Sequence, residues 1–142
     1  MGILGIDYGD KKVGLAKSVG QQALPLVILE NKNRPFLLSE IKKICQQENI
    51  SQIIVGVPLS LGAKKNSEFL READRQNEQM KKVLSFIDFL KSNLNIPVEM
   101  EDERLSTKMA NSLNKGAGRK QPEDAIAAML ILQNYLDKHK NI

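Results

Sequence analysis

The sequence predicts an α/β fold, a single domain over 1–142 with a five-stranded mixed sheet flanked by helices. Three short segments of β character follow one another near the N-terminus, and two further apolar strand-like segments alternate with stretches of helical periodicity. The chain has 142 residues, of which 42% are hydrophobic and 27% charged. These values are typical of one globular domain with one substantial core.

The first three strands are expected at about 2–8, 13–18 and 23–29. The first two form a predicted β-hairpin, because an apolar run ends at Asp7, turns through glycine and lysine, and resumes as a second apolar run. The short connections favour an antiparallel meander. Pro25 has no backbone N–H to donate, so the third strand is expected at an edge of the sheet.

Helices and strands alternate in the middle of the chain. Pro35, at a first-turn position, opens a helix that continues to about Glu48. The uniformly apolar segment 52–58 is typical of a central strand covered on both faces. A long helix is expected over 67–93, with many charges in its first half, and the alternating segment 96–102 predicts a half-exposed strand.

The C-terminal part of the chain adds two more helices to the prediction. Ser106 or Thr107 can cap a helix that ends near Asn114, and a cationic connection, 115–120, follows it. The final helix is expected from Glu123 to about Lys138, and its nearly continuous apolar surface should press against the sheet. Three antiparallel strands followed by alternating helices and strands are the order of an RNase H-like fold.

Residue usage limits the chemistry that the chain can carry out. His139 is the only histidine and Cys45 the only cysteine, so a catalytic triad, a histidine metal site and a thiolate cluster are not expected. Cys45 falls on the apolar stripe of its helix and is interpreted as a core residue. Any chemistry must therefore rest on carboxylates, hydroxyls and lysines.

Charge and hydropathy limit the partners. The net charge of +4 and the pI of about 9.2 permit a polyanion, whereas 4% aromatic residues and no tryptophan disfavour a surface built on base stacking. No run approaches the roughly 18 apolar residues of a membrane span, and no signal peptide is recognised. A cytoplasmic location without a membrane partner is expected.

Asp7 is the first functional candidate, because a carboxylate at the end of a buried strand is costly to desolvate unless it has a partner such as a metal ion. The alternative is that Asp7, Gly9 and Asp10 are ordinary turn formers. In an RNase H-like layout the last two strands join the sheet beside the first. Carboxylates at Asp102 or Glu103, and at Asp124 in the first turn of the final helix, could then converge with Asp7.

Four motifs, in order along the chain, carry a family resemblance. They are Gly5-Ile6-Asp7-Tyr8-Gly9 with Lys12-Val13-Gly14-Leu15-Ala16, then Val55-Gly56-Val57-Pro58-Leu59, then Asp102-Glu103-Arg104-Leu105-Ser106-Thr107, then Asp124-Ala125-Ile126-Ala127-Ala128. Together they resemble the YqgF family, also called RuvX. Its members are described as Holliday-junction resolvases or as nucleases that mature the 5′ end of pre-16S ribosomal RNA.

The resemblance implies a metal-dependent endonuclease that hydrolyses phosphodiester bonds. Two divalent ions about 3.5–4 Å apart can activate the water and stabilise both the transferring phosphoryl group and the leaving oxygen. Carboxylate ligands favour Mg²⁺ or Mn²⁺. Asp7, Glu103 and Asp124 are the predicted metal ligands and catalytic residues. Strand alternation places Asp102 and Glu103 on opposite faces, and the resemblance favours Glu103.

The substrate-binding residues predicted with this site are basic. Lys12 and Arg104 are candidates for holding phosphate, and Lys115, Arg119 and Lys120 for contacting the backbone of a nucleic acid. Arg104 could instead orient a carboxylate through an ion pair, and the 115–120 connection could be an ordinary solvated loop.

The resemblance favours maturation of pre-16S ribosomal RNA over cleavage of junction DNA. A junction resolvase generally requires a two-fold dimer, and both a monomer and a homodimer remain open. A non-catalytic RNA-binding factor for ribosome assembly is a further alternative. An ATPase of the actin–Hsp70 kind is disfavoured, because it needs two such domains. The chain departs from the family at Asp10, where threonine is usual, and at 60–63, where the family has a more polar stretch.

Overall fold

The computed structural model describes residues 2–57, 67–102 and 123–139, and for 67–77, 102 and 123–125 it describes the backbone only. The elements are β1 (Gly2–Tyr8), β2 (Lys12–Val19), β3 (Gln22–Glu30), α1 (Arg34–Gln47), β4 (Ile50–Val57), α2 (Ser67–Asn93), β5 (Val98–Asp102) and α4 (Glu123–Lys138). Their order confirms the predicted arrangement, with bounds within a residue or two of those expected. The helix expected near 106–114 lies outside the described residues.

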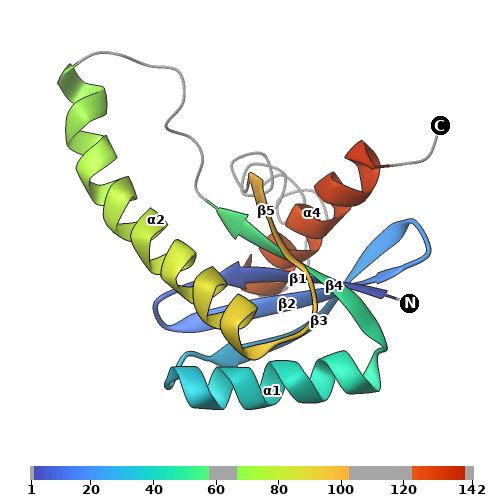
Figure 1. Cartoon of the computed structure of the whole chain (residues 1–142). Coiled ribbons are helices and arrows are strands. Elements are labelled where there is room, and N and C mark those ends of the chain that lie inside the picture. The colour runs from blue at the N-terminus through green and yellow to red at the C-terminus, as the bar shows by residue number, and fades with distance from the viewer. Residues whose placement is uncertain (1, 58–66, 103–122, 140–142) are drawn as a thin grey trace.

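The five strands form one mixed sheet in the order β3-β2-β1-β4-β5. The pairs β1/β2 and β2/β3 are antiparallel, whereas β1/β4 and β4/β5 are parallel. The expected edge position of β3 and interior position of β4 are both confirmed. Because β1, β4 and β5 run in the same direction, their carboxyl ends lie along one end of the sheet, where their arrowheads point in Figure 1.

Helices cover both faces of this sheet. On one face Leu4 and Ile6 of β1 belong to a large apolar cluster with Ile41 of α1 and Phe86 of α2. On the other face α4 packs against β1, β2, β3 and β4, and Leu132 belongs to a second apolar cluster. Successive residues of β1 therefore alternate between the α1/α2 face and the α4 face. None of the helices in the described ranges combines the length and apolar character of a membrane span.

Helix α1 shows how local sequence defines an element. The side chain of Asn33 accepts a hydrogen bond from the backbone N–H of Phe36 at 2.8 Å, and proline occupies the first turn. Leu37, Ile41 and Cys45, each four residues from the next, are buried against the sheet. Burial raises the pKa of the Cys45 thiol from 9.0 to about 11, so the thiol stays protonated at neutral pH. The interpretation of Cys45 as a core residue is confirmed.

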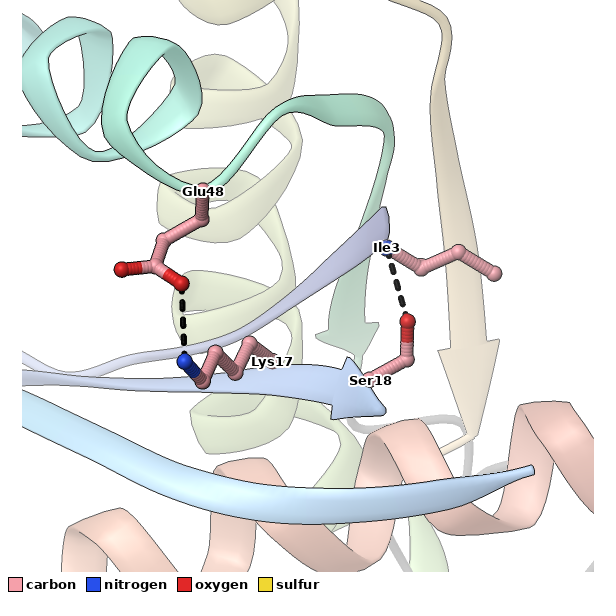
Figure 2. Close-up of polar contacts among 4 residues, drawn as sticks. All are labelled: Ile3, Lys17, Ser18 and Glu48. Atoms are coloured by element: carbon pink, nitrogen blue, oxygen red, sulfur yellow. Dashed lines mark hydrogen bonds and ion pairs between the residues drawn. The ribbon is translucent and has the colours of Figure 1, made fainter. Parts of the chain in front are cut away.

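Polar contacts hold the end of the sheet that lies away from the carboxyl ends of β1, β4 and β5. Figure 2 shows Lys17 of β2 paired with Glu48, which follows α1, with 2.8 Å between Nζ and Oε1. The backbone N–H of Ile3 donates to Ser18 Oγ at 2.9 Å. Both side chains of the ion pair are 30% exposed, so its net contribution is about 1 kcal/mol or less. The ion pair connects the end of α1 to β2, and the hydrogen bond connects β1 to β2.

Strand β5 is half exposed, as predicted, but an acidic residue is among its buried positions. Met100 is 53% exposed, whereas Glu101 is 6% exposed. Glu101 is buried because α4 covers its face of the sheet, and Lys138 of α4 places Nζ 2.6 Å from Glu101 Oε1. A buried carboxylate of this kind requires such a partner.

Gly5 is predicted to set the distance between β1 and α4. A Cβ at this position would lie 2.8 Å from the Cβ of Leu132 and 3.1 Å from the carbonyl oxygen of Ala128. We expect Gly5→Ala to lower the free energy of unfolding by about 1–3 kcal/mol, because α4 must move away from the strand. Urea unfolding measures this change.

Gly20→Asn is the matched control for Gly5→Ala. Gly20 has a φ of +62°, which asparagine tolerates, and no neighbouring atom would lie within 4 Å of a Cβ added there. We expect its stability to stay within about 0.5 kcal/mol of that of the wild type. Equal stability of Gly5→Ala and the wild type would contradict the packing argument.

Candidate active site

Asp7 lies near the end of β1 and is half-buried. It is paired with Gly14 of β2, and Tyr8 after it is still paired with Val13. Asp7 is therefore a strand residue, and the alternative that it forms the turn is wrong. By strand alternation Asp7 shares its face with Gly5, which contacts α4. The carboxylate thus belongs to the α4 face, at the carboxyl end of the strand.

The turn that follows Asp7 is held by hydrogen bonds on both sides of Gly9. The backbone N–H of Gly9 donates to the carbonyl of Lys12 at 3.0 Å, and the side-chain amide of Asn31 donates to the carbonyl of Gly9 at 2.8 Å. A Cβ at Gly9 would lie 2.6 Å from the carbonyl oxygen of Lys12, so this tight turn requires glycine. Asp10, in the turn itself, is exposed and pairs with Lys82 at 3.2 Å.

Helix α4 begins at the same end of the sheet. Ala128 and Leu132 lie over Gly5, whereas Tyr135, further along the helix, accepts a hydrogen bond from Gln52 near the start of β4. The helix therefore runs from the end of β1 towards its beginning, as Figure 1 also shows. Position 124, one turn before Ala128, is on the same stripe of the helix as Ala128 and Leu132. The backbone thus brings the first turn of α4 to the end of β1.

The end of β5 completes this edge. Val57 of β4 is in register with Asp102, and Gly56 with Glu101. Since Val55 is in register with Ile6, Asp102 is at the sheet end where Asp7 lies. The backbone therefore brings together the ends of two strands and a helix that are distant in sequence.

The predicted site residues fall into three groups. Asp7 and Lys12 have described side chains, and Lys12 is exposed at the start of β2, opposite Glu30. Asp124 is described by its backbone alone. The others lie outside the described residues: Glu103, Arg104, Lys115, Arg119 and Lys120. Among the side chains that the structure describes, no three acidic, histidine or cysteine residues group closely enough to hold a metal ion. The three-carboxylate centre stays a prediction.

Glu101 is a buried carboxylate near this edge that the sequence pattern alone did not single out. Besides its ion pair with Lys138, it lies near Tyr135, whose hydroxyl accepts a hydrogen bond from Gln52 at 2.8 Å. Burial raises the pKa of Tyr135, the Gln52 hydrogen bond opposes the rise, and the negative charges of Glu99 and Glu101 add to it. The available signal was the spacing of Glu99 and Glu101. Because they are two residues apart in a strand, both belong to one face of β5, and α4 covers that face at Glu101.

Known proteins resemble this chain over nearly its whole length. The family model of RuvX, described as Holliday junction resolvase, matches residues 1–138. A Rickettsia conorii protein is 32% identical over 99% of this chain and 88% of its own length. A Clostridium botulinum protein is 36% identical over 96% and 97%, and both relatives carry the name "Putative pre-16S rRNA nuclease".

Solved structures agree on the fold. RuvC of T. thermophilus in complex with a Holliday junction substrate has a TM-score of 0.60 at 14% identity, covering 97% of this chain and 94% of that chain. The Fowlpox virus resolvase in complex with Holliday junction DNA has a TM-score of 0.53 at 14% identity, covering 99% and 100%. These likenesses confirm the predicted RNase H-like fold. The chain belongs to the RuvX (YqgF) family and is a nuclease, a hydrolase of phosphodiester bonds.

Proposed function

We propose that this nuclease is a divalent-metal-dependent endonuclease that matures the 5′ end of precursor 16S ribosomal RNA in the cytoplasm. The position of Asp7 is the observation that carries the proposal. Its carboxylate lies at the carboxyl end of β1, on the α4 face, where α4 begins. The RNA substrate is taken from the names of the relatives that are 32% and 36% identical.

The donor set available at this edge fits Mg²⁺ or Mn²⁺. Asp7 offers hard oxygen atoms, and Asp124 is on the helix stripe that approaches the end of β1. On β5, Glu101 belongs to the α4 face, because it pairs with Lys138 of α4. Side chains two residues apart in a strand share a face, so this pattern supports Glu103 rather than Asp102 as the third ligand. When bound, two such ions would activate a water molecule and stabilise the charge that develops on the phosphoryl group.

The remaining roles belong to basic residues of the chain. Lys12 follows the turn after Asp7 and is exposed, so its ammonium group can hold a phosphate beside the carboxylate. Arg104 would contact the same phosphate or orient Glu103 through an ion pair. The basic loop, defined as Lys115, Arg119 and Lys120, would bind the backbone further along the substrate.

Two other functions are tested in parallel with the first. A Holliday-junction resolvase is favoured by the description of the matching family, and it would act as a two-fold homodimer rather than as a monomer. A non-catalytic RNA-binding factor would bind RNA without cutting it. Incubating the protein with precursor 16S RNA and with four-way junction DNA, with and without Mg²⁺ or Mn²⁺, separates the three functions. Cleavage of junction DNA alone, or binding without cleavage, would overturn the RNA-processing proposal.

Replacing Asp7 by asparagine tests the catalytic assignment. The amide is nearly isosteric but cannot bind a metal ion as an anion, so we expect the cleavage rate to fall at least about 100-fold, or about 2.7 kcal/mol in barrier height. Thermal stability without metal should hold or rise, because repulsion among the carboxylates is relieved. Asp88→Asn, the same change at an exposed position of α2, is the control. Wild-type cleavage by Asp7→Asn would refute the assignment.

Neutralising the basic loop tests its proposed contacts with phosphate. In the triple variant with Lys115, Arg119 and Lys120 changed to Gln, the slope of log affinity against log salt should decrease in magnitude by about 0.7 per lost contact on a single strand, or 0.9 on a duplex. Metal binding should survive, because the loop supplies no carboxylate. The control is a triple variant with Lys42, Lys43 and Lys91 changed to Gln, which removes the same charge from α1 and α2. An unchanged slope in the loop variant would identify the loop as an ordinary solvated connection.

A further inference from the structure

We infer that a second basic surface binds nucleic-acid backbone and guides it from Asp7 over the β1–β2 turn towards the start of α1. This turn-side surface consists of Lys11, Lys32, Arg34 and Lys82. The inference rests on the proposed function for the class of its ligand, a chain of phosphodiesters. It adds a path for the substrate on the α1/α2 side of the sheet edge, whereas the basic loop belongs to the segment between β5 and α4.

Three segments are joined at this surface by contacts between residues distant in sequence. The backbone N–H of Asn31 donates to the carbonyl of Lys11 at 2.8 Å, and its side chain donates to Gly9 at 2.8 Å. Lys82 of α2 reaches Asp10 in the turn at 3.2 Å. The β1–β2 turn, the β3–α1 connection and α2 therefore lie side by side at the end of the sheet that carries Asp7.

The cations of the turn-side surface are partly held in place. Arg34 donates from Nη1 to the carbonyl of Ser85 at 3.1 Å and from Nη2 to Ser85 Oγ at 3.0 Å. Since a guanidinium has five N–H donors, others remain for a ligand. Lys32 Nζ lies 4.9 Å from the ring centroid of Phe36. Positioned cations lose less conformational entropy on binding than free ones.

The turn-side surface carries four cations, and the described residues from 8 to 12 and from 30 to 34 add two acids. These are Asp10, paired with Lys82, and Glu30, which is opposite Lys12 in the strand register. Lys11 and Lys32 are exposed and, within the part of the chain that the structure describes, form no salt bridge. Helix α1 begins here without an acidic residue in its first turn, so its dipole adds to the positive potential. This potential lies at the same end of the sheet as Asp7, where the proposed function requires a phosphodiester chain to pass.

The test compares two charge-matched double variants in the Asp7→Asn background, which prevents cleavage during the measurement. Lys11→Gln with Lys32→Gln alters the turn-side surface. The control is Lys42→Gln with Lys91→Gln, which removes the same charge from α1 and α2. These two lysines lie near residues 93–98, at the start of β5 and away from Asp7. Binding of fluorescein-labelled single-stranded RNA and of duplex DNA is measured over a salt series. Circular dichroism melting confirms that each variant is folded.

We expect the slope of log affinity against log salt to decrease in magnitude in the Lys11/Lys32 variant. The decrease should be about 1.4 on single-stranded RNA, or about 1.8 on the duplex, since two contacts are lost. The Lys42/Lys91 variant should keep the parent slope. Equal slopes for the two double variants would overturn the inference, as would a parent protein whose binding does not depend on salt. Failure of the proposed function has a different outcome: the wild type would not cleave with Mg²⁺ or Mn²⁺, while the difference in slope would persist.

Discussion

The close packing of α4 on β1 at Gly5 fixes how the helix sits on the sheet and where its first turn lies. Because Gly5 has no side chain, Leu132 and Ala128 approach the strand backbone directly. The position of the helix along β1 then follows, and with it the place where the helix begins. Asp7 is two residues after Gly5 on the same face, and Asp124 is one turn before Ala128. One apolar contact therefore brings the strand end and the helix start together.

The two faces of the sheet contribute differently to this arrangement. The α1/α2 face holds the larger apolar cluster, which includes Phe86 and Ile41 and stabilises the sheet itself. The α4 face combines small residues such as Ala16 and Ala128 with polar contacts, among them the hydrogen bond between Gln133 and the backbone N–H of Ala23 at 2.8 Å. Small residues permit close approach, and side-chain hydrogen bonds fix the register of the helix. This face is suited to positioning a carboxylate on the strand relative to the helix.

Much of the fold could be predicted from the sequence because its signals are local. Pro25 indicated an edge strand, the apolar segment of β4 an interior one, and the charged turn after Asp7 a hairpin. Contacts between distant segments had no such signal. The ion pair of Glu101 with Lys138 joins residues 37 apart in sequence, and the pair of Lys82 with Asp10 joins residues 72 apart. For the site, residue pattern and family resemblance predicted Asp7, Glu103 and Asp124. The backbone brings the first turn of α4 to the end of β1, while the roles of all three residues stay predictions.

The proposed function requires carboxylates from β1, from the residue after β5 and from the first turn of α4 to form one metal centre. Crystals grown with Mn²⁺ test it most directly, because anomalous scattering locates the ions independently of any activity. We expect anomalous peaks at the carboxyl end of β1, where Asp7, Glu103 and Asp124 would hold the ions. If Mn²⁺ at a saturating concentration bound elsewhere on the protein and gave no anomalous peak at Asp7, the proposed metal centre would be contradicted.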